Sequence, residues 1–425
     1  MRILFVTPYF PPELGAPQTR IYEQAVRLRR KGHAVSILTT FPNYPTGVVP
    51  KEWKGRLWWH GNDAGVDIYR FWTYATANSG FYKRVLSQLS FALLACFAGL
   101  WLPATDAIVV ESPPLFDGIA AVFLSIAKRA PFVFYVSDLW PETAVQLGVL
   151  NNRLLIGIAK RLELLFYRRA ALVIAVTAGI HRSIAEEIDP ARVVMLRNAV
   201  DTDFFTPASD RTKLKETLEL PPGRFLVLYA GTLGLAQQLS TILECAGELQ
   251  KRGDDVHFVF AGDGAEKERL LQKATEMRLG NVRFLPPSPK AAMPGLLNSA
   301  DCILVSLKDA PIFSAALPTK LFEAMACGRP VVLAAAGEAE AVVRDAVAGY
   351  CARPGDAASI REAILQAHQH REGREEMGRR GRQYMVANFS RERQVEELLA
   401  VLGRVAPEAV SGRETPASRA TSEAA

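Results

Sequence analysis

Residues 318–323, Pro-Thr-Lys-Leu-Phe-Glu, combine a helix start with a cation and a carboxylate one turn apart. Pro318 and Thr319 stand where a helix begins, Lys320 follows at once, and Glu323 comes one turn later. The first N–H groups of a helix have no partner within it, and the N-terminus carries a partial positive charge. A lysine there is unfavourable unless an anion faces it. We therefore expect Thr319 and Lys320 to bind a diphosphate-sized anion.

Glu323 adds a sugar-binding group to this site. Its carboxylate can accept hydrogen bonds from two vicinal hydroxyls of a ribose, and a phosphate and a ribose one helical turn apart describe a nucleotide. The alternative is a surface pair between Lys320 and Glu323, which stabilises a helix by only about 0.2–0.5 kcal/mol. The apolar neighbours favour a buried helix, in which a carboxylate needs partners; they are Phe322, Ala324, Met325 and Ala326.

Two glycines lie at or after the ends of expected strands, where a phosphate can approach the backbone closely. Gly15 lies in the loop 8–20, just before the first expected helix, and Gly231 ends the strand 225–231. Their N–H groups can face an anion, although a lone glycine such as Gly15 is more often only a turn residue. The loop 8–20 lacks the G-x-G-x-x-G pattern and its later acidic residue, which argues against a nicotinamide-dependent enzyme. The Gly-Asp-Gly at 262–264 lacks the third glycine and is explained as a turn.

Asp138 ends another expected strand and precedes Leu-Trp-Pro. Open parallel sheets bind ligands at the carboxyl ends of their strands, so this carboxylate is a candidate catalytic residue. The alternative is that Asp138 caps the helix that begins near Pro141.

Strands and helices alternate along the chain, and most strands are continuous apolar runs, as in parallel sheets covered on both faces. One series fills residues 1–200 and a second follows the loop 198–210, which predicts two doubly wound α/β domains. The expected strands are 2–10, 34–40, 66–71, 107–112, 132–138, 172–177, 225–231, 256–262, 282–286, 302–307 and 330–335. The polar tail 407–425 is expected to be disordered.

Composition restricts the compartment and the partners. The five cysteines are dispersed without metal-ligand spacing, and the N-terminus lacks the long apolar region of a signal peptide, so we expect a cytosolic protein without disulfides or a metal site. Residues 1–200 contain 22 Lys and Arg against 14 Asp and Glu, whereas the remainder contains 28 against 30. The basic half suits an anionic partner, such as a lipid surface, a pyrophosphate or a nucleic acid, or simple solubility.

The segment 81–103 allows two interpretations. Its uninterrupted apolar run, 91–102, is too short to span a bilayer, which needs ~20 residues. We expect a helix buried in the domain core. The alternative is a helix in the membrane interface, with a basic aromatic rim of Phe81, Tyr82, Lys83 and Arg84. The expected helix 151–171 has the same two interpretations.

Several motifs, taken in order along residues 1–400, resemble family 4 of the retaining glycosyltransferases, which have the GT-B fold. They are PYFPPELGAPQTR (8–20), LRNAVDTDFF (196–205), AGDGAEKERL (261–270) and KLFEAMACGRPVV (320–332). SPPLFDGIA (112–120) and DLWPETAVQLGVL (138–150) are similar to the bacterial surface-polysaccharide branch, the colanic-acid and O-antigen transferases, including N-acetyl-fucosamine transferases.

The resemblance implies two Rossmann-like domains facing a central cleft. These would be an acceptor-binding domain over 1–200 and a nucleotide-sugar-binding domain over 201–385, with a helix over 386–406 packing back on the first. It further implies transfer from a nucleotide-sugar, expected to be a UDP-sugar, to a lipid-diphosphate-linked saccharide with retention of configuration. Such enzymes need no metal or other cofactor and bind no nucleic acid. The protein would work in polysaccharide biosynthesis, peripherally at the cytoplasmic face of the inner membrane.

Two catalytic features of the family pattern are not matched. Of the family's two glutamates separated by seven residues, Glu323 matches the second, which binds the ribose, whereas Ala315 occupies the first. The first-domain histidine near the reacting carbon has no clear match, and Asp138 is the nearest candidate. Two other functions therefore stay open: a UDP-sugar 2-epimerase of the same fold, and a catalytically inactive partner subunit that retains nucleotide binding.

The diphosphate contacts also depart from the family. The Arg and Lys that hold the diphosphate in the family fall on Thr232 and Gln237. We expect Lys320 to replace them, with Arg197 as a second candidate cation.

Overall fold

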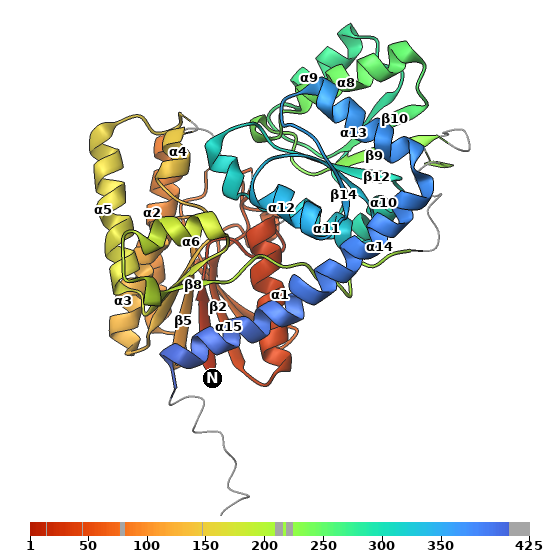
Figure 1. Ribbon diagram of the computed structural model, residues 1–425. Coiled ribbons are helices and arrows are strands. Elements are labelled where there is room, and N and C mark those ends of the chain that lie inside the picture. The colour runs from red at the N-terminus through yellow and green to blue at the C-terminus, as the bar shows by residue number, and fades with distance from the viewer. Residues whose placement is uncertain are drawn as a thin grey trace, which may run out of the picture. The chain divides into compact units, whose positions relative to one another are not determined.

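The computed structural model describes residues 1–13, 15–44, 46–76, 81–146, 148–208, 216–217 and 224–407. The chain divides into two compact units, one formed by residues 1–197 together with those from Gln394 onward, the other by Asn198–Arg393. Each unit contains one parallel or largely parallel sheet with helices (Figure 1), which confirms the predicted fold class. That the units face a central cleft stays a prediction. Beyond Pro407, the tail expected to be disordered lies outside the described residues.

The described residues of the first unit form eight strands: β1 (Arg2–Val6), β2 (Ala34–Thr40), β3 (Trp58–Asp63), β4 (Val66–Phe71), β5 (Ala107–Ser112), β6 (Phe132–Val136), β7 (Leu172–Ala175) and β8 (Val193–Met195). Their order is β3-β4-β2-β1-β5-β6-β7-β8, and only β3 runs antiparallel to its neighbour β4. The sequence did not predict β3, because this edge strand is polar and mostly exposed and lacks an apolar run. Nor did it predict β8, which is short.

The helices of this unit are α1 (Ala16–Arg30), α2 (Phe81–Leu100), α3 (Asp117–Lys128), α4 (Glu142–Gln146), α5 (Arg153–Arg169) and α6 (Ala178–Ala185), with 3-10 turns at Lys51–Trp53 and Pro190–Arg192. Figure 1 shows α2, α3 and α5 gathered on one side of the sheet, where α3 contacts both of the others. The last helix, α15 (Arg391–Val405), places Val395, Leu398 and Leu402 in the core of this unit.

Where the structure describes the second unit, it has six strands, all parallel, in the order β11-β10-β9-β12-β13-β14: β9 (Phe225–Ala230), β10 (Val256–Ala261), β11 (Val282–Leu285), β12 (Cys302–Ser306), β13 (Val331–Ala334) and β14 (Gly349–Cys351). Its helices are α8 (Leu239–Arg252), α9 (Lys267–Glu276), α10 (Met293–Asn298), α11 (Thr319–Ala326), α12 (Glu338–Asp345), α13 (Ala357–Gln369) and α14 (Arg371–Asn388). Short 3-10 turns lie at Leu235–Gln237, Lys290–Ala292 and Pro311–Ala315.

In both sheets the strand order reverses beside the first strand of the unit, so that later strands are added on its other side. β1 lies between β2 and β5, and β9 lies between β10 and β12. At such a switch point the loops that leave neighbouring strands diverge and open a crevice at the carboxyl ends. Each unit therefore has one topological position at which a ligand site is expected.

Helix α2 differs from the sequence expectation of a helix buried in the core. Phe91 and Ala95 are buried against the unit, but Phe97 on the outer face is 64% exposed. The stretch Tyr82–Leu100 has a mean hydropathy of 1.3 with 28% of its residues buried, so length and composition alone would allow it to cross a membrane. The core interpretation is therefore wrong for the outer face of this helix.

Candidate functional site

The switch point of the second unit brings together the loop after β9 and the first turn of α11. Gly231 directly follows β9, and α11 is the helix that follows β12, the strand beside β9. As predicted, α11 begins at Thr319, with Pro318 as a cap residue that offers no side-chain hydrogen bond. The N-terminus of α11 thus lies where the sheet topology predicts a ligand.

Lys320 reaches from α11 to the loop after β9. Its Nζ donates a hydrogen bond of 2.5 Å to Tyr229 Oη and lies 4.0 Å from the centre of that ring. Tyr229 Oη in turn donates to the main-chain oxygen of Thr232 at 2.6 Å. A Cβ added to Gly231 would lie 3.0 Å from Lys320 Nζ. The glycine therefore leaves the space that the ammonium occupies.

The ammonium of Lys320 lies in an environment that opposes its charge. The side chain keeps some exposed surface, but its charged end is surrounded by protein, and this burial lowers the pKa of Lys320 to about 7. The charge of Glu323 acts in the opposite direction and is the weaker effect. Among the described residues, no carboxylate lies within ion-pair distance of Lys320 Nζ, so the surface pair with Glu323 is not formed. An anion beside Lys320 would compensate this cost and raise the pKa.

The other predicted residues of this unit surround the same position. Thr319 is the half-buried first residue of α11, Thr232 is exposed on the loop after β9, and Glu323 is half-buried one turn behind Lys320. Tyr229 was missed, because a tyrosine inside an apolar strand is indistinguishable from a core residue. Its place one residue before the strand end, at the switch point, is the signal that could have identified it.

The backbone of the Gly-Asp-Gly loop after β10 packs directly against the backbone of the loop after β9. A Cβ on Gly262 would lie 1.9 Å from the main-chain oxygen of Gly231, and one on Gly264 would lie 2.4 Å from that of Leu233. Only glycine allows the two backbones to approach this closely. These glycines therefore hold the Gly231 loop in position, and the sequence interpretation as a plain turn misses this packing role.

The remaining predicted residues belong to the first unit. Asp138 follows β6 and accepts a hydrogen bond of 2.7 Å from Thr143 Oγ1 on α4, while burial raises the pKa of its carboxyl group. Gly15 is the cap residue of α1. Arg197 is exposed, and its main-chain oxygen accepts a bond of 2.5 Å from Gln394 Nε2. The three residues follow three different strands of the sheet, β6, β1 and β8 respectively.

A buried ionic cluster at the ends of β5 and β6 was not predicted. The Arg20 guanidinium pairs with Glu111, donates to Ser137 Oγ at 2.9 Å and lies 4.4 Å from the centre of the Tyr135 ring. Asp117 is fully buried nearby, and burial together with the Glu111 charge raises the pKa of its carboxyl group well above the usual value. We interpret the Arg20 pair as the contact that joins α1 to the strand ends of the sheet.

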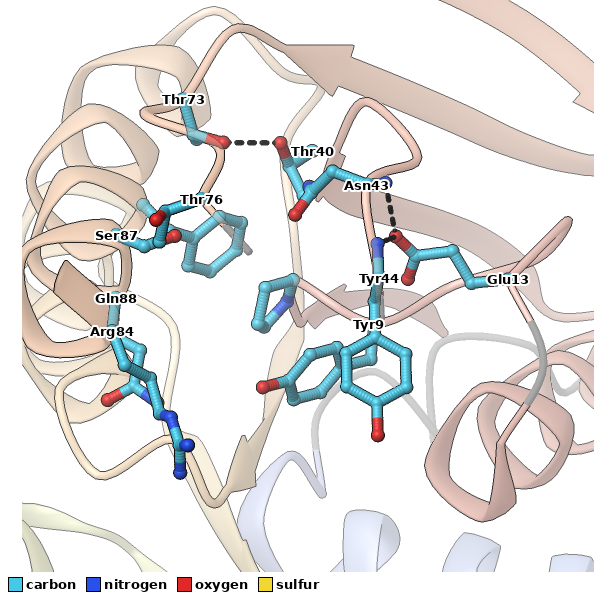
Figure 2. Close-up of a pocket in the computed structure, with 12 residues that line it drawn as sticks. Tyr9, Glu13, Thr40, Asn43, Tyr44, Thr73, Thr76, Arg84, Ser87 and Gln88 are labelled. Atoms are coloured by element: carbon cyan, nitrogen blue, oxygen red, sulfur yellow. Dashed lines mark hydrogen bonds between the residues drawn. The ribbon is translucent and has the colours of Figure 1, made fainter. Parts of the chain in front are cut away.

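A small pocket, partly open to solvent, lies at the carboxyl ends of β1, β2 and β4 in the same sheet (Figure 2). It is formed by the segments that follow β1, β2 and β4 and by the first half of α2. Tyr9, Glu13, Tyr44 and Arg84 line it together with six small polar side chains: Thr40, Asn43, Thr73, Thr76, Ser87 and Gln88. No sequence motif indicated this pocket, because its residues come from four separate segments.

Two family models match the chain, one in each unit. The glycosyl transferase 4-like domain matches residues 15–199, and the model for glycosyl transferases group 1 matches residues 210–384. A colanic acid biosynthesis glycosyl transferase of Escherichia coli (strain K12), WcaI, is 28% identical over 347 residues, which cover 79% of this chain and 83% of that protein. The D-inositol 3-phosphate glycosyltransferase of Salinispora tropica is 32% identical over 241 residues, 52% of this chain and about half (48%) of that protein.

Solved structures agree on the fold. HepE of Anabaena, solved in complex with UDP, matches with a TM-score of 0.71 at 18% identity, and the match covers 95% of this chain and 100% of that one. At this identity the likeness concerns the fold alone. With a glycosyl transferase 4-like domain followed by a group 1 glycosyl transferase domain, the chain is a glycosyltransferase of the GT-B type.

Proposed function

We propose that this glycosyltransferase moves a sugar from a UDP-sugar to a lipid-diphosphate-linked saccharide, with retention of configuration, in bacterial polysaccharide biosynthesis. The observation that carries the proposal is the ammonium of Lys320, buried beside Tyr229 at the switch point of the second unit without a carboxylate partner among the described residues. A diphosphate is the partner that such a cation lacks. HepE, a structural neighbour, has been solved with UDP and with UDP-glucose.

In this proposal the second unit stabilises the leaving diphosphate. Lys320 and the first N–H groups of α11 face the negative charge that grows on the diphosphate as the bond to the sugar breaks. The acceptor hydroxyl attacks the face that the diphosphate leaves and passes its proton to a phosphate oxygen, so that UDP and the glycoside are formed. Glu323 binds the ribose, and Thr232, Thr319 and Gly231 border the diphosphate. Because Lys320 supplies the cation, the reaction needs no metal.

The first unit binds the acceptor in this proposal. Asp138 stays a candidate catalytic residue, and Gly15 and Arg197 stay candidate contacts to the donor. The exposed apolar face of α2 supports a peripheral position at the cytoplasmic face of the inner membrane. The relative WcaI, a colanic acid biosynthesis enzyme by name, supports a surface polysaccharide as the product.

The test measures UDP release from a panel of UDP-sugars with and without bacterial lipid extract. We expect release only with the extract, and a loss of at least about 100-fold in Lys320→Ala, because two or more charge-assisted contacts disappear. Lys251→Ala, which removes an exposed lysine of α8, is the matched control. Near-normal turnover in Lys320→Ala would refute its role.

Two other outcomes would replace the proposal. Interconversion of sugar epimers without accumulation of UDP would identify an epimerase of the same fold. Nucleotide binding without turnover across the whole panel would identify an inactive partner subunit, for which the missing first glutamate at Ala315 would then account.

A further inference from the structure

Lys320 and Tyr229 belong to opposite sides of the second sheet and meet at the end of β9. We propose that Tyr229 is the positioning residue of this site, whose hydroxyl fixes the Lys320 ammonium at the strand end and stabilises its charge. That a donor diphosphate then faces this ammonium rests on the proposed function. The action of Tyr229 on Lys320 does not.

The contact crosses from one face of the sheet to the other. Side chains of successive strand residues point to opposite faces. Leu228 and Ala230 pack in the hydrophobic cluster that includes α11, whereas Tyr229, between them, packs in the cluster that includes α8. Lys320 on α11 therefore reaches past the end of β9 to contact Tyr229. Gly231 leaves the gap for it, because an added Cβ would lie 3.0 Å from Nζ and 3.2 Å from Cε of Lys320.

The direction of the Lys320 side chain is unusual for a lysine near the surface. Such a lysine normally turns its ammonium toward water. Here Nζ lies 4.0 Å from the centre of the Tyr229 ring and 2.5 Å from Oη. Attraction to the aromatic ring and a charge-assisted hydrogen bond both favour the ammonium over the neutral amine. Tyr229 thus supplies the two contacts that replace part of the lost hydration.

The proton of the Tyr229 hydroxyl is already engaged. A carbonyl oxygen can only accept, so Oη donates its proton to the main-chain oxygen of Thr232, at 2.6 Å. The same peptide group is held on its other side, where the N–H of Leu233 donates to the main-chain oxygen of Asp263 at 2.8 Å. The lone pairs of Oη therefore face Lys320, and the bond between the two side chains is strongest when Lys320 is charged.

The aromatic ring that carries this hydroxyl is fixed by its neighbours. Tyr229 is only 1% exposed. Its ring packs tilted against Phe260 of β10 with 6.1 Å between ring centres, and Phe260 stacks on Phe284 of β11 at 5.2 Å. A phenylalanine at position 229 would keep this aromatic row and remove only the oxygen. The substitution Tyr229→Phe therefore isolates the role of the hydroxyl.

The other charged groups near the site do not replace this contact. The charge of Glu323, on the same helix as Lys320, favours the ammonium but is outweighed by burial. The segments that follow β10, β12 and β13 carry further charges, none of them buried: Asp263, Lys308, Asp309 and Glu338. Among the described residues, none of these four forms a hydrogen bond or an ion pair with the Lys320 side chain. The hydroxyl of Tyr229 is therefore the polar side-chain group that holds the ammonium directly.

The first test follows the protonation of Lys320 in the full chain without ligand. Nuclear magnetic resonance of protein labelled with carbon-13 at lysine Cε gives the titration midpoint, and the loss of one signal in Lys320→Met identifies the residue. We expect Tyr229→Phe to lower the midpoint by about one pH unit, because one charge-assisted hydrogen bond disappears. A midpoint that is unchanged or raised would overturn the inference.

The matched control is Tyr167→Phe. Tyr167 is a buried tyrosine of α5, and its hydroxyl donates a bond of 2.6 Å to Glu163. This variant also loses one buried hydroxyl bond, but in the first unit, so the midpoint of Lys320 should not change. Thermal melting verifies that both tyrosine variants fold.

The second test measures UDP affinity by calorimetry at pH 8 and pH 5.5. With the pKa of Lys320 at about 7 in the wild type and about one unit lower in Tyr229→Phe, the charged fractions differ about tenfold at pH 8. We therefore expect the variant to bind UDP about tenfold more weakly at pH 8 and less than about threefold more weakly at pH 5.5, where most of the lysine is charged in both proteins.

Two results of the second test would overturn the inference. An equal loss at both pH values would give Tyr229 a merely structural role. Tighter binding of UDP by Tyr229→Phe would mean that Tyr229 withholds Lys320 from the donor. If the wild type binds no UDP at either pH, the proposed function fails, whereas the midpoint measured without ligand still decides the role of Tyr229. The two failures are thereby distinguished.

Discussion

Replacing Lys320 by methionine should make the ligand-free protein more stable at pH 7 while it removes donor binding. In the unfolded chain this lysine is protonated up to pH 10.5, whereas burial lowers its pKa in the folded protein to about 7. At pH 7 the folded protein therefore either keeps the buried charge of Lys320 or releases its proton. Both lower the free energy of unfolding. Methionine keeps the length of the side chain and removes that cost.

The magnitude follows from the two pKa values. The interval from 10.5 to about 7 corresponds to about 4–5 kcal/mol at ~1.4 kcal/mol per pH unit. Because the side chain keeps some exposed surface and the variant loses the hydrogen bond to Tyr229, we expect a net gain of about 2–3 kcal/mol in the free energy of unfolding. Between pH 7 and 10.5 the unfolded wild type binds more protons than the folded one, so its stability rises with pH. The gain should therefore shrink toward zero near pH 10.

Differential scanning calorimetry of the full chain without ligand, at pH 7 and pH 10, measures this difference. Lys251→Met, at an exposed lysine of α8, is the control and should change little at either pH. A Lys320→Met variant that is less stable than wild type at pH 7 would refute the reasoning. So would a gain of the same size at both pH values, because the effect would then not come from the lowered pKa of Lys320.

Three further outcomes are expected. At pH 8 a lysine with a pKa of about 7 is about 90% neutral, so UDP binding should take up about 0.9 proton, measured by calorimetry in buffers of different ionisation enthalpy, and an uptake near zero would contradict this role of Lys320. Gly231→Ala should lower the affinity for UDP and destabilise the protein by about 1–3 kcal/mol, because φ is 141° and the new Cβ would meet Lys320 Nζ at 3.0 Å; unchanged calorimetric affinity would contradict this. Deleting residues 407–425 should leave UDP release unchanged, and a large loss would show that the tail contributes to activity.

Much of the strand pattern was predictable because the decisive information is local. The strands 34–40, 66–71 and 107–112 agree with β2, β4 and β5 residue for residue. Each is an apolar run bounded by polar or turn residues, and burial on both faces of a parallel sheet requires that run. β3 escaped prediction because an exposed edge strand needs no apolar run, and its pairing with β4 is decided by the neighbour.

The candidate site was predictable only in part. An anion-binding role for Thr319, Lys320 and Glu323 can be inferred from their types and spacing. The reason is that the N-terminus of a helix carries a partial positive charge, so a lysine there indicates a nearby anion. Tyr229 is 91 residues away from Lys320 along the chain, and only the adjacency of β9 and β12 brings the two together. No local pattern marks such a contact.

The sequence by itself determined the two α/β series, the start of α11 at Thr319 and the presence of a cation there, because periodicity and helix-end electrostatics act over a few residues. The tertiary structure alone decided that the ammonium of Lys320 is enclosed beside Tyr229, and that α2 has a polar pocket on one face and an exposed apolar surface on the other. Burial depends on which distant segments pack together. The pKa of Lys320 and the two-sided character of α2 are consequences of that packing.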